Sequence, residues 1–149
     1  MYYIFESLLV GIYSLLIYLS FDLDFNANIK LFMVGFVKHL LGYILNIHTY
    51  YCNNGYACLK YQKQLHASKP SQHNNSNLKT KRVAKISIDS LFVESCFEGG
   101  LFVFLNLLLL KLKIKNNYVR IFLLGVILHI IFEFLQLHMY FCKRCVLIK

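Results

Sequence analysis

The chain has 149 residues, of which 58% are hydrophobic and only one is proline, and its mean hydropathy is +0.52. This composition excludes an ordinary soluble domain, which is closer to half apolar and has fewer unbroken apolar runs. The formal charge of +9 attracts polyanions in general. In so apolar a chain it favours anionic lipid headgroups, so no specific nucleic-acid partner is expected.

Four apolar segments are predicted to cross a membrane as helices, at residues 2–21, 29–51, 90–112 and 118–141. Each is close to the ~20 residues that a helix needs to cross about 30 Å of hydrocarbon. The first segment lacks the basic start and the small-residue cleavage site of a signal peptide, so it should remain as a span. The predicted fold is therefore all-α, an integral membrane four-helix bundle.

The connection between the second and third spans, residues 59–89, is polar and basic. Its middle has the composition of a flexible linker, so we expect a first hairpin at 1–58, a basic polar linker at 59–89 and a second hairpin at 90–149. The positive-inside rule places the linker and both termini in the cytoplasm, where the lysines would meet anionic headgroups. A short basic stretch at 111–115 argues for the opposite orientation.

The two predicted hairpins resemble each other in sequence. Residues 30–52 and 120–142, aligned with an offset of 90, have identical residues at Phe32/Phe122, Gly35/Gly125, His39/His129, Leu45/Leu135, His48/His138, Tyr50/Tyr140 and Cys52/Cys142. The first and third spans match at an offset of 88, with Glu6/Glu94, Ser7/Ser95 and Gly11/Gly99. The pattern predicts a duplicated two-span hairpin whose halves are related by a pseudo-two-fold axis along the membrane normal.

Polar and small residues are expected to form packing seams inside this bundle. At 100° per residue, one interior stripe holds His39 and Asn46, and the matching stripe holds His129, Glu133 and Gln136. The Ser-xxx-Gly patterns at Ser7 and Ser95 allow close approach of helix backbones. We interpret these features as structural rather than as a ligand site.

A second set of polar residues is expected near the cytoplasmic interface. His48 lies nine residues after His39, on the opposite side of a continuous helix. Glu6 lies about one turn inside its span, on the same membrane side as His48, and Glu94 has the same relation to His138. We therefore predict structural intramembrane pairs Glu6–His48 and Glu94–His138, which offset the burial of each carboxylate.

The five cysteines leave three interpretations open. Cys52 and Cys58 follow the first hairpin, and Cys142 and Cys145 follow the second. Together with His48 and His138 they could bind zinc, or they could form a redox centre like that of quinone-linked thiol oxidases. As structural features they are disulfides within each pair or free thiols, and a cytoplasmic location argues against stable disulfides. The structural interpretation is favoured, with neither a metal nor a cofactor.

Motifs typical of enzymes are missing from the sequence. There is no nucleophile elbow, no phosphate-binding glycine loop and no HExxH. The sequence therefore predicts neither an enzyme nor a small-molecule substrate.

The residue usage suggests an AT-rich gene, because Phe, Tyr, Ile, Asn and Lys are abundant and Trp is absent. With this bias, the stretches ESLLVGIYSLLIY and GFVKHLLGYILNIHTYYCNNGYAC resemble small multi-span proteins of nucleocytoplasmic large DNA viruses. Some members of that group lie in the membrane under the capsid as minor capsid or virion membrane proteins. The resemblance implies a structural protein of the virion internal membrane (host endomembrane during assembly) that contacts lipid and links it to capsid or other membrane proteins. A small subunit of an organellar respiratory complex, a membrane thiol oxidase and a transporter remain alternatives.

Overall fold

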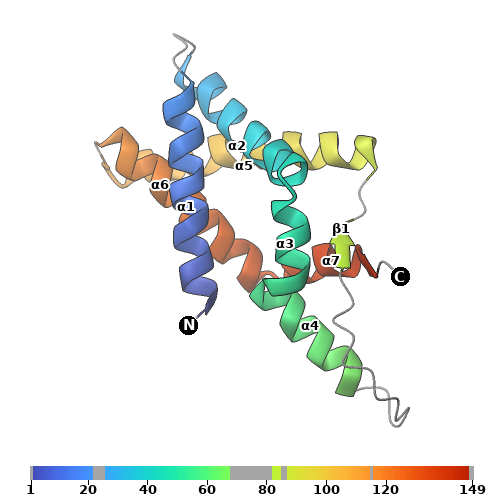
Figure 1. The fold of residues 1–149 in the computed structure, drawn as a ribbon. Helices are drawn as coiled ribbons and strands as arrows, with labels where there is room; N and C mark the ends of the chain where they lie inside the picture. Colours follow the sequence, from blue (N-terminus) through green and yellow to red (C-terminus); the bar gives the residue numbers. More distant parts are fainter. Residues whose placement is uncertain (1, 22–25, 68–81, 85–86, 115, 148–149) are drawn as a thin grey trace.

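The computed structural model describes residues 2–21, 26–67, 82–84, 87–114 and 116–147 (Figure 1). The helices are α1 (Tyr2–Ser20), α2 (Ala27–Ile44), α3 (Ile47–Asn54), α4 (Tyr56–Ala67), α5 (Ile88–Lys111), α6 (Asn117–Phe134) and α7 (Leu137–Lys143). Two three-residue strands, β1 (Arg82–Ala84) and β2 (Cys145–Leu147), pair in antiparallel register with Val83 opposite Val146. The mainly helical fold that the sequence predicts is confirmed, with this short strand pair added.

Three helices of the described residues are long and apolar enough to cross a membrane. They are α1 from Tyr3, α5 and α6, while α2 and α3 meet the same criteria only as a pair bent by 72°. The prediction of a membrane protein is thus supported by helix length and composition. The four predicted spans become three straight candidates and one broken candidate.

Two of the predicted spans are not continuous helices. Within the segment predicted at 29–51, helix α2 stops at Ile44. Within the segment predicted at 118–141, helix α6 stops at Phe134. After each helix one residue takes the left-handed conformation, Asn46 with φ 58° and Gln136 with φ 57°. Asparagine is enriched in this conformation, whereas glutamine adopts it less readily. The apolar pattern continues through both breaks without proline or glycine, which explains why the sequence predicts single helices.

The long helices pack mainly against partners from the other half of the chain. The largest interfaces are α2 with α5 and α1 with α6, while α1 with α2 and α5 with α6 contact each other less (Figure 1). Val34 of α2, Phe102 of α5 and Leu124 of α6 are fully buried in the shared core. The two predicted hairpins therefore build one core between them.

In each of the two large interfaces a glycine of one helix lies against a glycine of the other. A Cβ added to Gly35 of α2 would lie 2.9 Å from Gly99 Cα of α5, and one added to Gly125 of α6 would lie 2.9 Å from Gly11 Cα of α1. Next to these glycines, Ser7 and Ser95 are fully buried and donate hydrogen bonds to carbonyl oxygens of their own helices. The predicted Ser-xxx-Gly seams are confirmed as places where helix backbones approach closely.

We expect Gly35→Ala to lower the free energy of unfolding by about 1–3 kcal/mol, as overpacking does. The added methyl group would meet the Glu98 carbonyl oxygen and Gly99 Cα, both at 2.9 Å, and backbone atoms cannot rotate away. The matched control is Gly100→Ala, because nothing lies within 4 Å of that position and alanine favours a helix by up to about 1 kcal/mol over glycine. The free energy of unfolding of each variant is measured in detergent micelles. Equal effects of the two substitutions would contradict the close approach.

One end of the molecule gathers α3, α4, α7 and the two strands (Figure 1), and we call these elements the disulfide end. The start of α1 reaches it, since the ring centroids of Tyr3 and Tyr56 are 6.0 Å apart. Disulfides Cys52–Cys145 and Cys58–Cys142 lie there, and Cys96 is the free thiol of the described chain.

The disulfides differ from the predicted cysteine pairing. Each bond joins the first half of the chain to the second, so pairing within a hairpin and free thiols are both wrong for these four cysteines. The physical reason is the contact between α4 and α7, which brings the two cysteine-bearing segments together.

The predicted basic linker at 59–89 is partly helical. Its start belongs to α4, which continues to Ala67, and its end contributes β1 and the first residues of α5. The rest of the predicted linker, residues 68–81 and 85–86, lies outside the described residues.

Candidate functional site

A cavity of about 390 Å³ lies between the two halves of the chain, with walls from α1, α2, α3, α5, α6 and α7. Apolar side chains such as Val10, Leu128 and Phe132 form part of the wall. The polar residues that line it are Tyr13, Lys38, His39, His48, Tyr51, Glu94, Glu98, His129, His138, Tyr140 and Arg144. Ionisable residues within membrane spans are expensive to bury and often functional, so this cavity is the candidate site.

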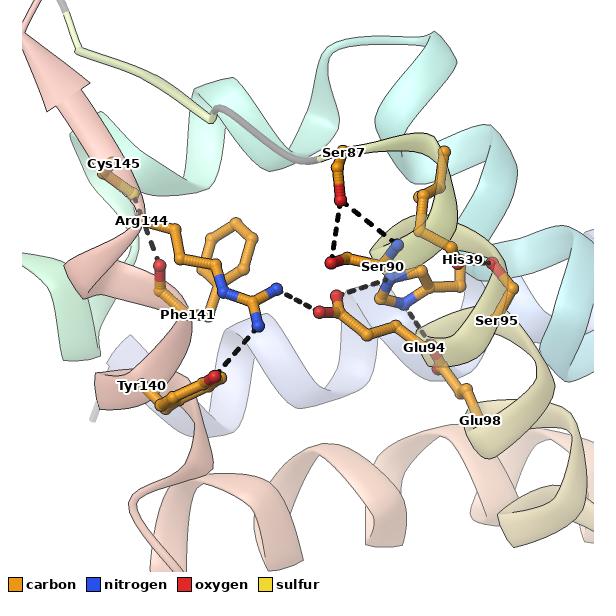
Figure 2. A network of polar contacts seen from close by, with 11 residues as sticks. His39, Ser87, Ser90, Glu94, Ser95, Glu98, Tyr140, Phe141, Arg144 and Cys145 are labelled. Carbon is orange, nitrogen blue, oxygen red and sulfur yellow. Dashed lines mark hydrogen bonds and ion pairs between the residues drawn. The ribbon is translucent and has the colours of Figure 1, made fainter.

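A network of alternating charges crosses the cavity wall from α2 to the end of α7 (Figure 2). Lys38 forms an ion pair with Glu98, and both side chains are about nine-tenths buried. His39 Nδ1 donates to Glu98 Oε2 at 2.8 Å, and His39 Nε2 lies 3.4 Å from Glu94 Oε2. Glu94 in turn accepts a hydrogen bond from Arg144. The network therefore connects three helices without an unpaired charge.

Arg144 stands at the outer end of this network, beyond the membrane-spanning helices. Its guanidinium donates to the Tyr140 hydroxyl at 3.1 Å and to Glu94. Hydrogen bonds to Tyr140 and to Glu94 raise the pKa of Arg144 above its ordinary value. This side chain therefore stays charged and ties α7 to α5.

The opposite side of the cavity holds a second polar cluster. Glu6 Oε2 lies 3.8 Å from His129 Nε2, and Glu6 Oε1 accepts a hydrogen bond from the Tyr56 backbone N–H at 2.9 Å. The ring centroids of His129 and His138 are 4.6 Å apart. His138 Nδ1 donates to Glu133 Oε2 at 3.0 Å. The cluster thus connects α1 and α6 with α7 and the start of α4.

The predicted pairs Glu6–His48 and Glu94–His138 are wrong in their partners. Glu6 faces His129 and Glu94 faces His39, so each glutamate meets a histidine of the other half. The reason is the packing of α1 against α6 and of α5 against α2. The sequence correctly indicates that both glutamates lie close to histidines.

The helix breaks also change the predicted separation of the histidines. On a continuous helix His48 would point away from His39, yet their ring centroids are 4.9 Å apart, and His129 and His138 are arranged alike. The left-handed residue at each break redirects the chain and invalidates the count of 100° per residue beyond it. As a result, all four histidines line one cavity.

The residues of the predicted interior stripe lie in different surroundings. His39 and His129 line the cavity, and Glu133 is half-buried against His138. Asn46 and Gln136 are exposed, which contradicts the prediction. They are the left-handed residues of the two breaks, so their backbones bend the chain and their side chains point away from the interior.

Three residues of the site were not predicted from the sequence: Glu98, Tyr51 and Arg144. A signal for Glu98 exists in the comparison of the two halves. At the offset of 90 Lys38 corresponds to Leu128, and at the offset of 88 Glu98 corresponds to Val10. The ion pair between α2 and α5 thus corresponds to two apolar residues on α1 and α6, and all four residues line the cavity.

The cysteines do not form a metal site in this structure. Cys52, Cys142 and Cys145 are oxidised, so the zinc alternative lacks the thiolate ligands that zinc needs. No group of three His, Cys, Asp or Glu side chains within the described ranges is arranged to hold a metal ion.

Aromatic side chains separate the disulfides from the cavity. Tyr51 and Phe141 pack against Cys58 and Cys142 and also line the cavity, whereas no cysteine lines it. A molecule bound in the cavity therefore does not reach a sulfur atom directly, which argues against the thiol-oxidase alternative.

Comparison with known proteins adds no relative. No family model matches the chain, and neither a curated protein nor a solved structure is detectably similar to it. The function is therefore inferred from the residues themselves.

Proposed function

We propose that this chain is a structural, non-enzymatic membrane protein of a large DNA virus particle, where it links the internal membrane to the capsid shell. The viral setting follows from the resemblance of its first two spans to small virion membrane proteins. The structural role follows from the site, whose charged groups are engaged with one another instead of being held ready for a reaction.

The observation that carries the proposal is the disulfide end. Two disulfides fasten α3 and α4 to α7 and β2, which gives this end a fixed shape. Lys63 of α4 and Lys143 of α7 are exposed there, and each lysine near an anionic surface contributes about 1 kcal/mol. A rigid basic surface of this kind suits anionic headgroups and acidic capsid proteins.

A duplicated hairpin that forms a four-helix bundle is part of the same proposal. It is supported by features that recur in both halves at nearly constant offsets. Among them are the left-handed breaks, the glycine contacts and the exchange of glutamate–histidine partners. A duplication explains why both halves contribute to one cavity and why each half supplies one cysteine to each disulfide.

The disulfides have to be reconciled with the proposed membrane orientation of the chain. The positive-inside rule favours a cytoplasmic location for the disulfide end, where thiols are normally kept reduced. In the proposed setting the four cysteines therefore stay paired as disulfides only where the surroundings are oxidising, outside the reducing cytoplasm.

Charge reversal at the disulfide end tests the proposed link. The variant Lys63→Glu/Lys143→Glu should enter purified particles roughly thirtyfold less well than the unaltered chain, because two favourable contributions of about 1 kcal/mol each are lost. Quantitative mass spectrometry against the major capsid protein measures the number of copies.

The matched control reverses two exposed lysines at the far end of α5, Lys111→Glu/Lys113→Glu. This control should be incorporated normally. Equal incorporation of both variants would overturn the link. Recovery of the unaltered chain in a respiratory complex instead of particles would favour the organellar alternative.

A further inference from the structure

The four bonded cysteines differ in how far they are buried. Cys52, Cys58 and Cys142 are 0%, 1% and 2% exposed, whereas Cys145 is partly exposed. The Cys58–Cys142 bond therefore joins two buried residues, and the Cys52–Cys145 bond has one partner near the surface. Thiol–disulfide exchange requires a thiolate to reach a sulfur atom of the bond. A thiol in solution should therefore react first at Cys145.

The two disulfides also lie next to each other. Cys145 packs against the buried cluster of Ala57, Cys58 and Cys142. Arg144, which directly precedes Cys145, keeps a helical conformation with φ −84° and ψ −4°. Residues three apart on a helical turn have Cβ atoms about 5–6 Å apart, and a disulfide needs about 3.5–4.5 Å. A small movement of this turn therefore lets Cys145 bond to Cys142.

We propose that Cys142 and Cys145 form a thiol–disulfide exchange site through which a dithiol reductant opens both cross-links. One thiolate of the reductant bonds to Cys145 Sγ, the Cys52–Cys145 bond breaks, and Cys52 leaves with the electron pair and takes up a proton. The second thiol of the reductant then attacks the reductant's own sulfur in this mixed disulfide. Cys145 leaves as a thiolate, and the reductant becomes a cyclic disulfide. This first stage transfers two electrons to the protein.

The second stage needs no further reductant. The Cys145 thiolate bonds to Cys142 Sγ, the Cys58–Cys142 bond breaks, and Cys58 leaves with the electron pair and takes up a proton. The bond Cys142–Cys145 replaces Cys58–Cys142, so the number of disulfides does not change in this step. Because the new bond lies within one turn, a single two-electron reduction removes both covalent links between the two halves of the chain. The inference goes beyond the proposed structural role and does not depend on it.

Two variants that lack the same disulfide test the exchange, both in a Cys96→Ala background. Cys52→Ser keeps the Cys145 thiol beside the Cys58–Cys142 bond, and Cys52→Ser/Cys145→Ser removes it. A thiol held next to its target acts at about millimolar effective concentration, so with about 0.1 mM dithiothreitol the buried bond should open about tenfold faster in Cys52→Ser. The rate is measured on the full chain in detergent micelles by acid quench, alkylation and mass spectrometry. Circular dichroism establishes that both variants are folded.

The positions of the free thiols separate exchange from direct reduction. Without any reductant, Cys52→Ser that is labelled with a maleimide under denaturing conditions should carry label on Cys58 as well as on Cys145. In the unaltered chain, one equivalent of dithiothreitol should give a Cys142–Cys145 disulfide with thiols at Cys52 and Cys58. Equal rates of opening in the two variants, or label confined to Cys145 in Cys52→Ser, would each overturn the proposal.

Discussion

Replacing Lys38 with leucine should lower the free energy of unfolding by about 3–5 kcal/mol, the cost of breaking a buried ion pair by removing one partner. The substitution leaves Glu98, whose side chain is 9% exposed, with His39 as its remaining basic contact. Unfolding in detergent micelles, followed by circular dichroism, measures the loss.

The corresponding positions on α1 and α6 supply the control for this experiment. The double variant Lys38→Leu/Glu98→Val copies Leu128 and Val10, the residues at the corresponding positions. Replacing both members of a buried pair with apolar residues is often neutral or stabilising. The double variant should therefore be more stable than Lys38→Leu alone. A purely additive result, with each substitution adding its own loss, would contradict an interaction between the two charges.

Removing both disulfides should destabilise the chain far more than removing either one. Cys52 and Cys145 are 93 residues apart and Cys58 and Cys142 are 84 apart, so the first bond to form closes a loop worth about 4.7 kcal/mol in chain entropy. The second bond then closes only a short additional ring, on the order of ten residues, worth about 3 kcal/mol. We expect each pairwise Cys→Ser variant to lose about 3 kcal/mol and the fourfold variant about 7 kcal/mol.

Alkylation before reduction establishes that the disulfides are present in the protein tested. Only Cys96 should be modified in the folded chain, because the other four cysteines are bonded. Cys96→Ala serves as the control and should change stability little, since this side chain is only partly buried. Modification of more than one cysteine per chain would contradict the pairing, and so would equal losses in the pairwise and fourfold variants.

The spans and their contact surfaces could be predicted from the sequence, because they depend on local signals. Apolar runs of about twenty residues indicate helices that suit a membrane, and the spacing of Ser7 and Gly11 indicates a seam. The interruption at Asn46 could not be predicted in this way. The residues around the break include neither proline nor glycine, and apolar residues continue on both sides of it.

For the polar residues of the site, the type of contact could be predicted from the sequence, but the partner residues could not. Glu6 and Glu94 needed histidines nearby, and the sequence indicated this correctly, but whether the histidine comes from the same half depends on how the helices cross. That crossing is decided by the packing of many side chains and of glycine pairs such as Gly35 and Gly99, and no single position reveals it. The disulfide partners were missed for the same reason.

The exchange of partners between the halves has a consequence for synthesis on the ribosome. His39 is made 59 residues ahead of Glu98, and at about 5–20 residues per second its partner follows roughly 3–12 s later. In this interval the neighbouring Lys38 has no carboxylate from the second half, and on translocon scales a central lysine costs about 2.5–3.5 kcal/mol. The first two helices therefore need shielding by the insertion machinery, and a second half from a neighbouring nascent chain can pair with them to give an exchanged dimer. The length of the connection sets the duration of this exposure.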